Sequence, residues 1–350
     1  MKITHNPTPL ADRPPLHHQG RHPRGKIKTM RFIAVQLSHI DLDDDTYSLL
    51  PPCCSAEPAA ALIESIRRFG VLHPPIIKER EGGAFVVVAG RKRLRILKKQ
   101  GAGSSCHCLM APADTPEENT LDLCLEEALL HGPLTPVQRA TFFAKALQWN
   151  VAEKLAVRIL PRLGLPPSPY LIRRDLPLLD LEEPLLVALH HGTLEEKVAL
   201  ELTGLSFGDR LALFAVISDL HLSVGNQKKF LAACRELAAR NNITIRALLS
   251  AAAVDAIIHH EEANPPQKTA NLMKWLERER FPRLVAAEKE FHHFVAGFTL
   301  PPGVRLEHSP SFEKDEVILT LSCANRAHFQ TIWQRIIDLV PPRPVQESRP

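Results

Sequence analysis

The spacing of apolar residues changes along the chain and predicts a different element in each segment. Residues 32–40 alternate apolar and polar side chains closely enough to predict an edge strand. Residues 58–70 instead repeat apolar side chains at helical spacing and end in glycine, which predicts a helix closed by Gly70. Residues 71–79 predict a strand entered through prolines, which are tolerated where a strand begins.

The run Phe-Val-Val-Val-Ala at residues 85–89 is unbroken and rich in β-branched side chains. It predicts a central strand, entered through a hairpin turn that contains two glycines. Gly90 ends the run, and the strongly basic residues 91–100 predict a helix closed by Gly101. Residues 105–110 predict a last strand, which completes a small α/β domain.

From about residue 117, β-branched residues become rare and amphipathic helical periods separated by glycine or proline take over. The end of the chain changes character again and predicts two strands between helices. The predicted fold class is therefore α+β. Its predicted parts are a flexible basic arm (1–31), the small α/β domain (32–115), an all-helical DNA-binding domain (116–258), a linker (259–271) and a C-terminal α+β unit (272–340). In the C-terminal unit, helices are predicted at 272–296 and 325–339, and strands between them at 304–308 and 316–322.

Composition bounds the class of protein. Hydrophobic residues make up 45% and charged residues 23%, which is typical of a soluble globular protein. No run approaches the ~20 apolar residues that a membrane helix needs, and the seven irregularly spaced cysteines favour a reducing cytoplasm. We therefore predict a cytoplasmic protein with no membrane partner, which either begins with a basic arm or has its true start at Met30.

The net charge of +4 identifies no partner by itself, but basic residues gather near 21–31, 91–99 and 173–174. A glycine between a buried strand and a helix lets the backbone approach a ligand, and the first helical turn favours an anion. Arg91, Lys92 and Arg93 add fixed charge at the same place, which predicts a phosphate site. A solvated basic helix face remains the alternative.

The stretch Gly90–Lys98, with Gly101 in register, resembles the basic motif that follows a strand in ParB-type chromosome and plasmid partition proteins. In that family the motif reads Gly-Glu-Arg-Arg, an aromatic residue, arginine, two alanines and lysine. Residues 65–74 are similar to the family's Ser-Ile…Gly…Gln-Pro motif. The resemblance covers about residues 32–250. It implies a ParB/sulfiredoxin-like N-terminal domain followed by a helix-turn-helix domain.

The resemblance also implies a ligand, CTP with Mg²⁺. In the family the basic motif binds the triphosphate with help from a second motif, Glu-Asn, two residues and Arg, which here becomes Glu127, Ala128 and His131. Because Arg91, Ala128 and His131 depart from the family pattern, we expect weak or altered nucleotide binding and little turnover. The implied nucleotide- or phosphate-binding residues are Gly70, His73, Gly90, Arg91, Lys92, Arg93, Glu127 and His131.

Residues 151–181 have the outline of a helix-turn-helix. One amphipathic helix ends at Gly164, a proline-rich turn follows, and a second helix begins near Ser168. The second helix would turn an N-cap hydroxyl and basic groups toward DNA phosphates and guanine edges. A bundle corner with two exposed arginines remains the alternative. The predicted DNA-binding residues are Ser168, Tyr170, Arg173 and Arg174.

The hypotheses that result differ in class. The first is a nucleoid-associated DNA-binding protein for partition or related regulation, with double-stranded DNA, a second copy of the chain and a ParA-type ATPase as partners. The second is a ParB-fold enzyme, a nuclease or nucleotide hydrolase, for which the nearby carboxylates are Glu117, Glu118, Glu126 and Glu127. The third is a relative that keeps DNA binding and has lost the nucleotide switch.

We predict no catalytic residue and no metal ligand. Cys106 and Cys108 share one face of a predicted strand but lack a clear second pair of ligands, so they are interpreted as small buried hydrophobic residues.

Overall fold

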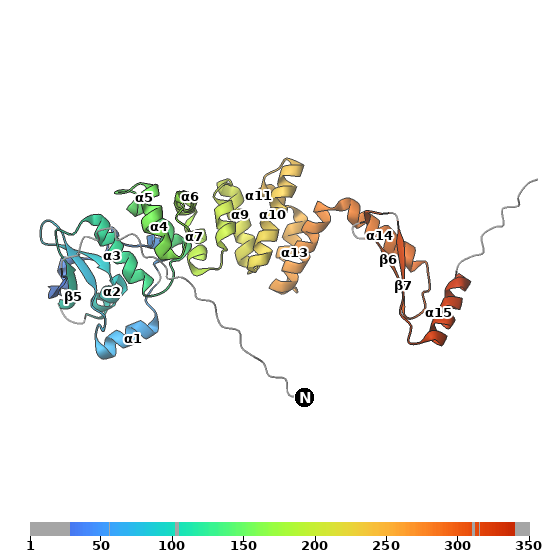
Figure 1. Cartoon of the computed structure of the whole chain (residues 1–350), viewed down its shortest axis with the longest axis horizontal. Coiled ribbons are helices and arrows are strands. Elements are labelled where there is room, and N and C mark those ends of the chain that lie inside the picture. Colours follow the sequence, from blue (N-terminus) through green and yellow to red (C-terminus); the bar gives the residue numbers. More distant parts are fainter. Residues whose placement is uncertain (1–28, 56, 102–104, 310–311, 315, 340–350) are drawn as a thin grey trace, which may run out of the picture. The chain divides into compact units, whose positions relative to one another are not determined.

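The computed structural model describes residues 29–339 apart from 56, 102–104, 310–311 and 315 (Figure 1). The chain divides into two compact units, the first ending at His190 and the second beginning at His191, and each is described by itself. Residues 1–28 of the predicted basic arm lie outside the described residues. In the described part of the chain, no helix is both long and apolar enough to span a bilayer.

Unit 1 is built on a five-stranded sheet with the strand order β1-β5-β3-β4-β2. Its elements, with η marking 3-10 helices, are β1 (Arg31–Gln36), η1 (Leu37–His39), β2 (Ile40–Asp41), η2 (Pro52–Cys54), α1 (Ala60–Phe69), β3 (Ile76–Glu79), β4 (Phe85–Ala89), α2 (Arg91–Gln100), β5 (Ser105–Ala111), α3 (Glu117–Leu129), α4 (Pro136–Ala146), α5 (Ala152–Arg158), η3 (Leu160–Leu163), α6 (Pro169–Asp175), η4 (Leu176–Asp180) and α7 (Glu183–His191). Strand β1 is an edge strand and pairs antiparallel with β5, whereas β3 and β5 are parallel.

Strand β4 is buried on both faces, which explains its unbroken apolar sequence. Val87 faces the core formed with α1 and α2, where it joins Leu94. Val86 and Val88 point the other way, into the core that includes Leu125 of α3. In Figure 1, α1 and α3 accordingly lie on opposite sides of the sheet. A single residue thus separates helix α2 from the end of a strand that is packed on both faces, and this packing holds the start of the helix in place.

One continuous core joins the sheet to the helices that follow it. Phe142 and Phe143 of α4, Leu155 of α5 and Ile172 of α6 are fully buried in the same cluster as the β4 valines. The predicted boundary between residues 115 and 116 therefore falls inside unit 1. The segment predicted to be a helix-turn-helix and the strand that precedes the basic helix belong to one folded body.

Unit 2 is helical and ends in a hairpin and a helix. Its elements are α8 (Glu196–Leu202), α9 (Phe207–Asp219), α10 (Val224–Asn241), α11 (Ile245–Leu249), α12 (Ala252–Ile258), α13 (Pro265–Arg280), α14 (Pro282–Ala296), β6 (Val304–His308), β7 (Val317–Leu321) and α15 (Arg326–Leu339). Strands β6 and β7 pair antiparallel, with Leu306 opposite Leu319. The predicted α+β fold class is confirmed, including the C-terminal strands.

Two predicted boundaries in unit 2 need correction. The predicted linker, 259–271, contains the first turns of α13, because Asn264 and Gln267 form a reciprocal capping box with two 3.0 Å hydrogen bonds. Helix α13 also buries Leu272 in the unit 2 core. The single helix predicted at 272–296 is interrupted, since Pro282 has no N–H to continue the hydrogen-bond ladder and begins α14 instead.

Candidate functional site

Helix α2 begins at a glycine that no other residue could easily replace. Gly90 adopts a left-handed conformation, with φ 88° and ψ 18°. A Cβ atom added there would lie 3.0 Å from the Cα atom of Pro75. The backbone N–H groups of Arg91 and Lys92 follow in the first turn, where a helix offers them no carbonyl acceptor. This geometry presents donors and the positive end of the helix dipole together.

Seven of the eight predicted phosphate-binding residues line one pocket of about 790 Å³. These are His73, Gly90, Arg91, Lys92, Arg93, Glu127 and His131. Gly70, the eighth, does not line the pocket. It closes α1 with φ 74° and donates its N–H to the Ile66 carbonyl at 2.9 Å, so its role in this structure is to end a helix.

Arg93 ties three parts of the pocket together. Its Nη2 atom lies 3.1 Å from Glu127 Oε1 at the end of α3, and its Nη1 atom donates to the His73 carbonyl just before β3. His131 Nε2 lies 4.0 Å from the same Glu127 oxygen. Both members of the Arg93–Glu127 pair are mostly shielded from solvent, with side chains 15% and 24% exposed. The pair therefore fixes the geometry of the pocket wall.

Arg91 and Arg95 converge on a single backbone carbonyl. Arg91 Nη1 donates to the Leu42 oxygen at 2.8 Å, and Arg95 Nη2 lies 3.4 Å from the same atom. The Nη2 atom of Arg91 is buried and has no hydrogen-bond acceptor in the described part of the chain. Burial, and next the neighbouring Arg95, lower the pKa of Arg91, whereas Asp44 opposes the shift. Arg91 remains a cation at neutral pH, because an arginine pKa starts far above 7.

The loop between β2 and α1, which supplies another wall of the pocket, was not predicted from the sequence. Tyr47, Ser48, Leu49, Leu50 and Ser55 line the pocket from this loop. The one available signal was Tyr47, an isolated aromatic residue in an acidic segment and one of two tyrosines in the chain. It is 2% exposed and anchors the loop to the core.

Contacts with α3 and α4 hold this loop in place. The hydroxyl of Tyr47 donates to Glu117, whose other oxygen accepts from the buried Lys78 Nζ at 2.7 Å. Cys124 donates its Sγ–H to the Tyr47 carbonyl at 3.0 Å. Burial raises the pKa of Cys124 to about 12, so this thiol stays protonated at neutral pH. Lys145 Nζ donates to the Thr46 carbonyl at 3.1 Å, and burial lowers its pKa.

The carboxylates that a nuclease would need are all engaged with cations. Glu117 pairs with Lys78 at 2.7 Å, Glu118 pairs with Arg158 at 2.7 Å, and Glu126 and Glu127 pair with Arg162 and Arg93. Among the described residues, no cluster of three or more His, Cys, Asp or Glu side chains could hold a metal ion.

The segment predicted to be a helix-turn-helix consists of two short helices joined by a 3-10 helix and a turn. Helix α5 leads into η3, Gly164 turns the chain with φ 71°, and Ser168 stands at the N-cap of α6 in an extended conformation. The Ser168 side chain makes no capping hydrogen bond. Tyr170 is 67% exposed. The Arg173 guanidinium is exposed and lies 2.5 Å from Glu153 of α5.

Arg174 differs from Arg173, because it contacts a buried carboxylate. Its guanidinium lies 2.7 Å from Asp175 Oδ1, and Arg139 of α4 contacts the other oxygen, Oδ2, at 2.5 Å. Asp175 is completely buried. Asp175 thus joins α6 to α4 through Arg139, with Arg174 on its other oxygen, whereas the side chains of Tyr170 and Arg173 are exposed to solvent.

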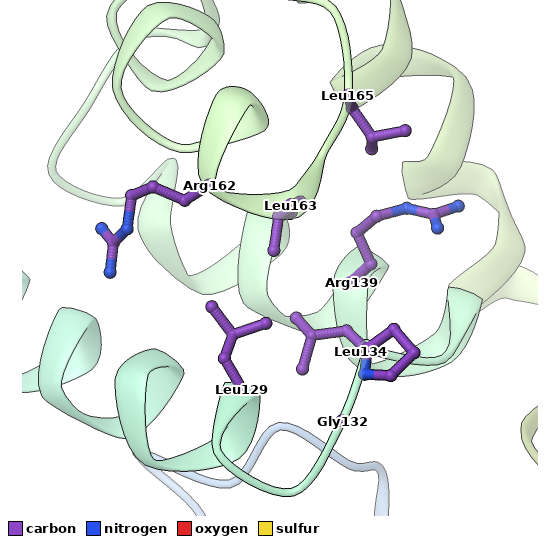
Figure 2. Close-up of a pocket in the computed structure, with 8 residues that line it drawn as sticks. Leu129, Gly132, Leu134, Arg139, Arg162, Leu163 and Leu165 are labelled. Carbon is purple, nitrogen blue, oxygen red and sulfur yellow. The ribbon is translucent and has the colours of Figure 1, made fainter.

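A second pocket of about 520 Å³ lies between the end of α3 and the turn that precedes α6. Figure 2 shows Leu129, Leu134, Leu163 and Leu165 around it. Arg139 and Arg162 extend away from one another in this view. Both arginines are used in ion pairs, Arg139 with Asp175 and Arg162 with Glu126. Leucine side chains from the end of α3 and from the turn before α6 thus face one another across this pocket.

Comparison with known proteins identifies the N-terminal part. Residues 26–125 match the family of the ParB N-terminal domain. The chain is 31% identical over 161 residues to the nucleoid occlusion protein of Geobacillus sp. (strain WCH70), covering 46% of this chain and 55% of that protein. It is 29% identical over 168 residues to the probable chromosome 1-partitioning protein ParB of Deinococcus radiodurans, covering 48% and 55%.

The chain thus spans about half the length of the curated relatives that it matches. Among solved structures, ParB of Caulobacter crescentus complexed to the centromeric parS site covers 56% of this chain and 96% of that one, at 18% identity and a TM-score of 0.32. The ParB resemblance drawn from the Gly90 and Gly70 motifs is confirmed by the family match. Residues 26–125 of the chain therefore form a ParB N-terminal domain.

Proposed function

We propose that this protein binds double-stranded DNA and acts in chromosome or plasmid partition, or in related regulation, with a nucleotide in the pocket at the start of α2. The observation that carries the proposal is the shared core of unit 1. In that core a cationic pocket of a ParB N-terminal domain and a helix-turn-helix segment pack as one body. Relatives named for nucleoid occlusion and chromosome partition support the same assignment.

The pocket suits the triphosphate of CTP. Arg91, Lys92, Arg93 and Arg95 line it, and the first turn of α2 offers backbone N–H groups to an anion. We propose little or no turnover. Glu127, the surviving acid of the second motif, is held by Arg93, and Ala128 offers no polar side chain.

Calorimetric titration with CTP, GTP, ATP and UTP, with and without duplex DNA, tests the proposal. The expected result is preferential CTP binding whose affinity changes when DNA is present, with negligible release of phosphate. Absence of binding to every triphosphate would contradict the nucleotide part of the proposal. Rapid phosphate release would favour the nucleotide hydrolase instead.

Replacing Arg173 by alanine is expected to weaken DNA binding and to lower the slope of log K against log salt by about one, the value for one lost phosphate contact. Arg173 is the cleaner probe of α6, because Arg174 also contacts the buried Asp175. Fluorescence anisotropy of a labelled duplex at several salt concentrations measures both quantities. Glu153→Gln is the matched control, since it removes the partner and keeps the cation. Equal affinity and slope in Arg173→Ala would contradict the placement of α6 on DNA.

We further propose that the protein is a homodimer that pairs through its C-terminal unit, and that it acts on the nucleoid in the cytoplasm together with a ParA-type ATPase. Helix α15 exposes Phe329, Trp333 and Ile337 at intervals of four residues, each more than 40% exposed. Strand β7 leaves Val317, Ile318 and Leu319 exposed as well. Exposed apolar faces of this kind mark association surfaces.

The variant Trp333→Glu is expected to raise the dissociation constant of the dimer by about thirtyfold or more, because a central aromatic side chain dominates such interfaces. Light scattering over a range of protein concentrations measures the shift toward a species of half the mass. Gln330→Glu, which adds the same charge at an exposed position of the same helix, should keep the mass of the unmodified chain. If Trp333→Glu also keeps that mass, the contact lies elsewhere.

A further inference from the structure

The charged groups around the nucleotide pocket do not fit a divalent cation. Among the described lining residues, four are permanent cations, Arg91, Lys92, Arg93 and Arg95, and the one carboxylate is Glu127. Magnesium is held by oxygen ligands in octahedral geometry and usually needs at least one available carboxylate. The Oε1 atom of Glu127 lies 3.1 Å from Arg93 Nη2. The pocket therefore surrounds an anion with positive charge, and the one carboxylate among its described lining residues is already paired with an arginine.

Arg91 places a cation at the very start of the basic helix. It is the first residue of α2, directly after Gly90, and stands where the ParB motif has glutamate. Its Nη1 atom is fixed by the Leu42 carbonyl at 2.8 Å, whereas the buried Nη2 atom has no acceptor among the described residues. A buried charged donor without an acceptor is unfavourable, so an incoming anion that supplies an acceptor gains binding energy there.

Arg95 strengthens this arrangement from one turn further along α2. Its Nη2 atom approaches the same Leu42 carbonyl at 3.4 Å, so two guanidinium groups share one neutral acceptor. Two like charges held close together repel each other, and an anion next to them relieves the repulsion. The loop that provides Leu42 also lines the pocket, so the anion would lie beside both arginines and the first turn of α2.

We propose that this pocket binds a nucleoside triphosphate without a divalent cation, and that the Arg91 guanidinium provides the charge compensation that Mg²⁺ gives a triphosphate in solution. The inference rests on the proposed function, in which the pocket binds a nucleotide. Arg91 donates to the phosphate oxygens from a position fixed by Leu42. Lys92 and the first-turn N–H groups complete the anion site.

Titration calorimetry of the full chain with CTP, once with excess Mg²⁺ and once with EDTA, tests the inference. For the unmodified chain, the two dissociation constants should agree within about threefold, because arginine side chains balance the negative charge of the bound triphosphate. Arg91→Gln should weaken binding in EDTA by about 10- to 100-fold, the value of one charge-assisted hydrogen bond. Arg91→Glu should abolish binding in EDTA and regain it when Mg²⁺ is added.

Lys99→Gln is the matched control, since Lys99 lies on the same helix and pairs with Glu57 in solvent outside the pocket. Its affinity for CTP should stay within about twofold of the unmodified chain, because an exposed charge is screened by salt. Binding in Mg²⁺ that disappears in EDTA for the unmodified chain overturns the inference and leaves the proposed function intact. If Arg91→Gln binds CTP in EDTA as tightly as the unmodified chain, Arg91 does not compensate the charge of the triphosphate and the inference is overturned. No binding of CTP under either condition overturns the inference together with the CTP part of the proposed function, and leaves the proposed DNA binding untouched.

Discussion

Replacing Asp175 by alanine is expected to lower the free energy of unfolding of unit 1 by about 3–5 kcal/mol, the cost of removing one partner from a buried ion pair. Asp175 is completely buried at the end of α6 and contacts two arginines, Arg139 of α4 at 2.5 Å and Arg174 at 2.7 Å. Without the carboxylate, both guanidinium groups lose a charged partner at the seat of α6. DNA binding should fall as well, because α6 would no longer be held on α4.

Urea denaturation measures the loss of stability, and hydrogen exchange of peptides from α4 and α6 assigns it to unit 1. Glu153→Ala is the matched control. It removes an acid that pairs with an arginine of the same helix, Arg173, but both side chains are at least 60% exposed. An exposed pair contributes about 0–1 kcal/mol. A cost for Asp175→Ala no larger than that of Glu153→Ala would show that the buried cluster does not hold α6 in place.

The parts of the fold that the sequence predicted well depend on local signals. The apolar run at residues 85–89, the glycine that ends it and the basic helix after it follow one another directly, and their order fixes the start of α2. The hairpin turn before β4 likewise follows from Gly82 and Gly83, which both adopt positive φ angles. Residues adjacent in sequence carry this information, so no long-range contact is needed to read it.

The pocket wall formed by the loop after β2 could not be predicted in this way. Its position depends on partners that are distant in sequence, such as Glu117, which accepts from the Tyr47 hydroxyl, and Lys145, which binds the Thr46 carbonyl. No periodic pattern marks a segment whose structure is determined by such contacts. For the same reason the sequence did not reveal that Arg91 and Arg95 share the Leu42 carbonyl.

Helix α13 illustrates a different kind of error. Its capping box, Asn264 with Gln267, is legible in the sequence, but it lies in a polar stretch with two prolines that also fits a linker. The structure shows that a proline at the first helical position is compatible with the helix, because its missing N–H would have had no intrahelical acceptor. The decisive signal was the apolar spacing of Leu272 and Leu276, which are both buried.

The variant Gly90→Ala is expected to lower the free energy of unfolding of unit 1 by about 2–4 kcal/mol, from a left-handed backbone and a steric conflict together. Gly90 has φ 88°, and a Cβ atom would lie 3.0 Å from Pro75 Cα and 3.1 Å from Arg93 Nη2. Relief of this conflict requires movement of backbone at the entry to β3 or of the arginine that binds Glu127. Binding of CTP should therefore fall by at least about tenfold, since the anion site is built on this turn.

Gly101→Ala separates the two causes. Gly101 ends the same helix in the same left-handed region, with φ 61° and ψ 13°, but an added Cβ would meet no described atom within 4 Å. This control should show the backbone cost alone, about 1–2 kcal/mol, and should leave CTP binding unchanged. Denaturation and calorimetry on the two variants give both quantities. If the two variants lose equal stability and neither loses CTP binding, the close approach of Gly90 to Pro75 has no part in shaping the anion site. A larger loss confined to Gly90→Ala would show that a glycine is needed there for space as well as for its backbone conformation.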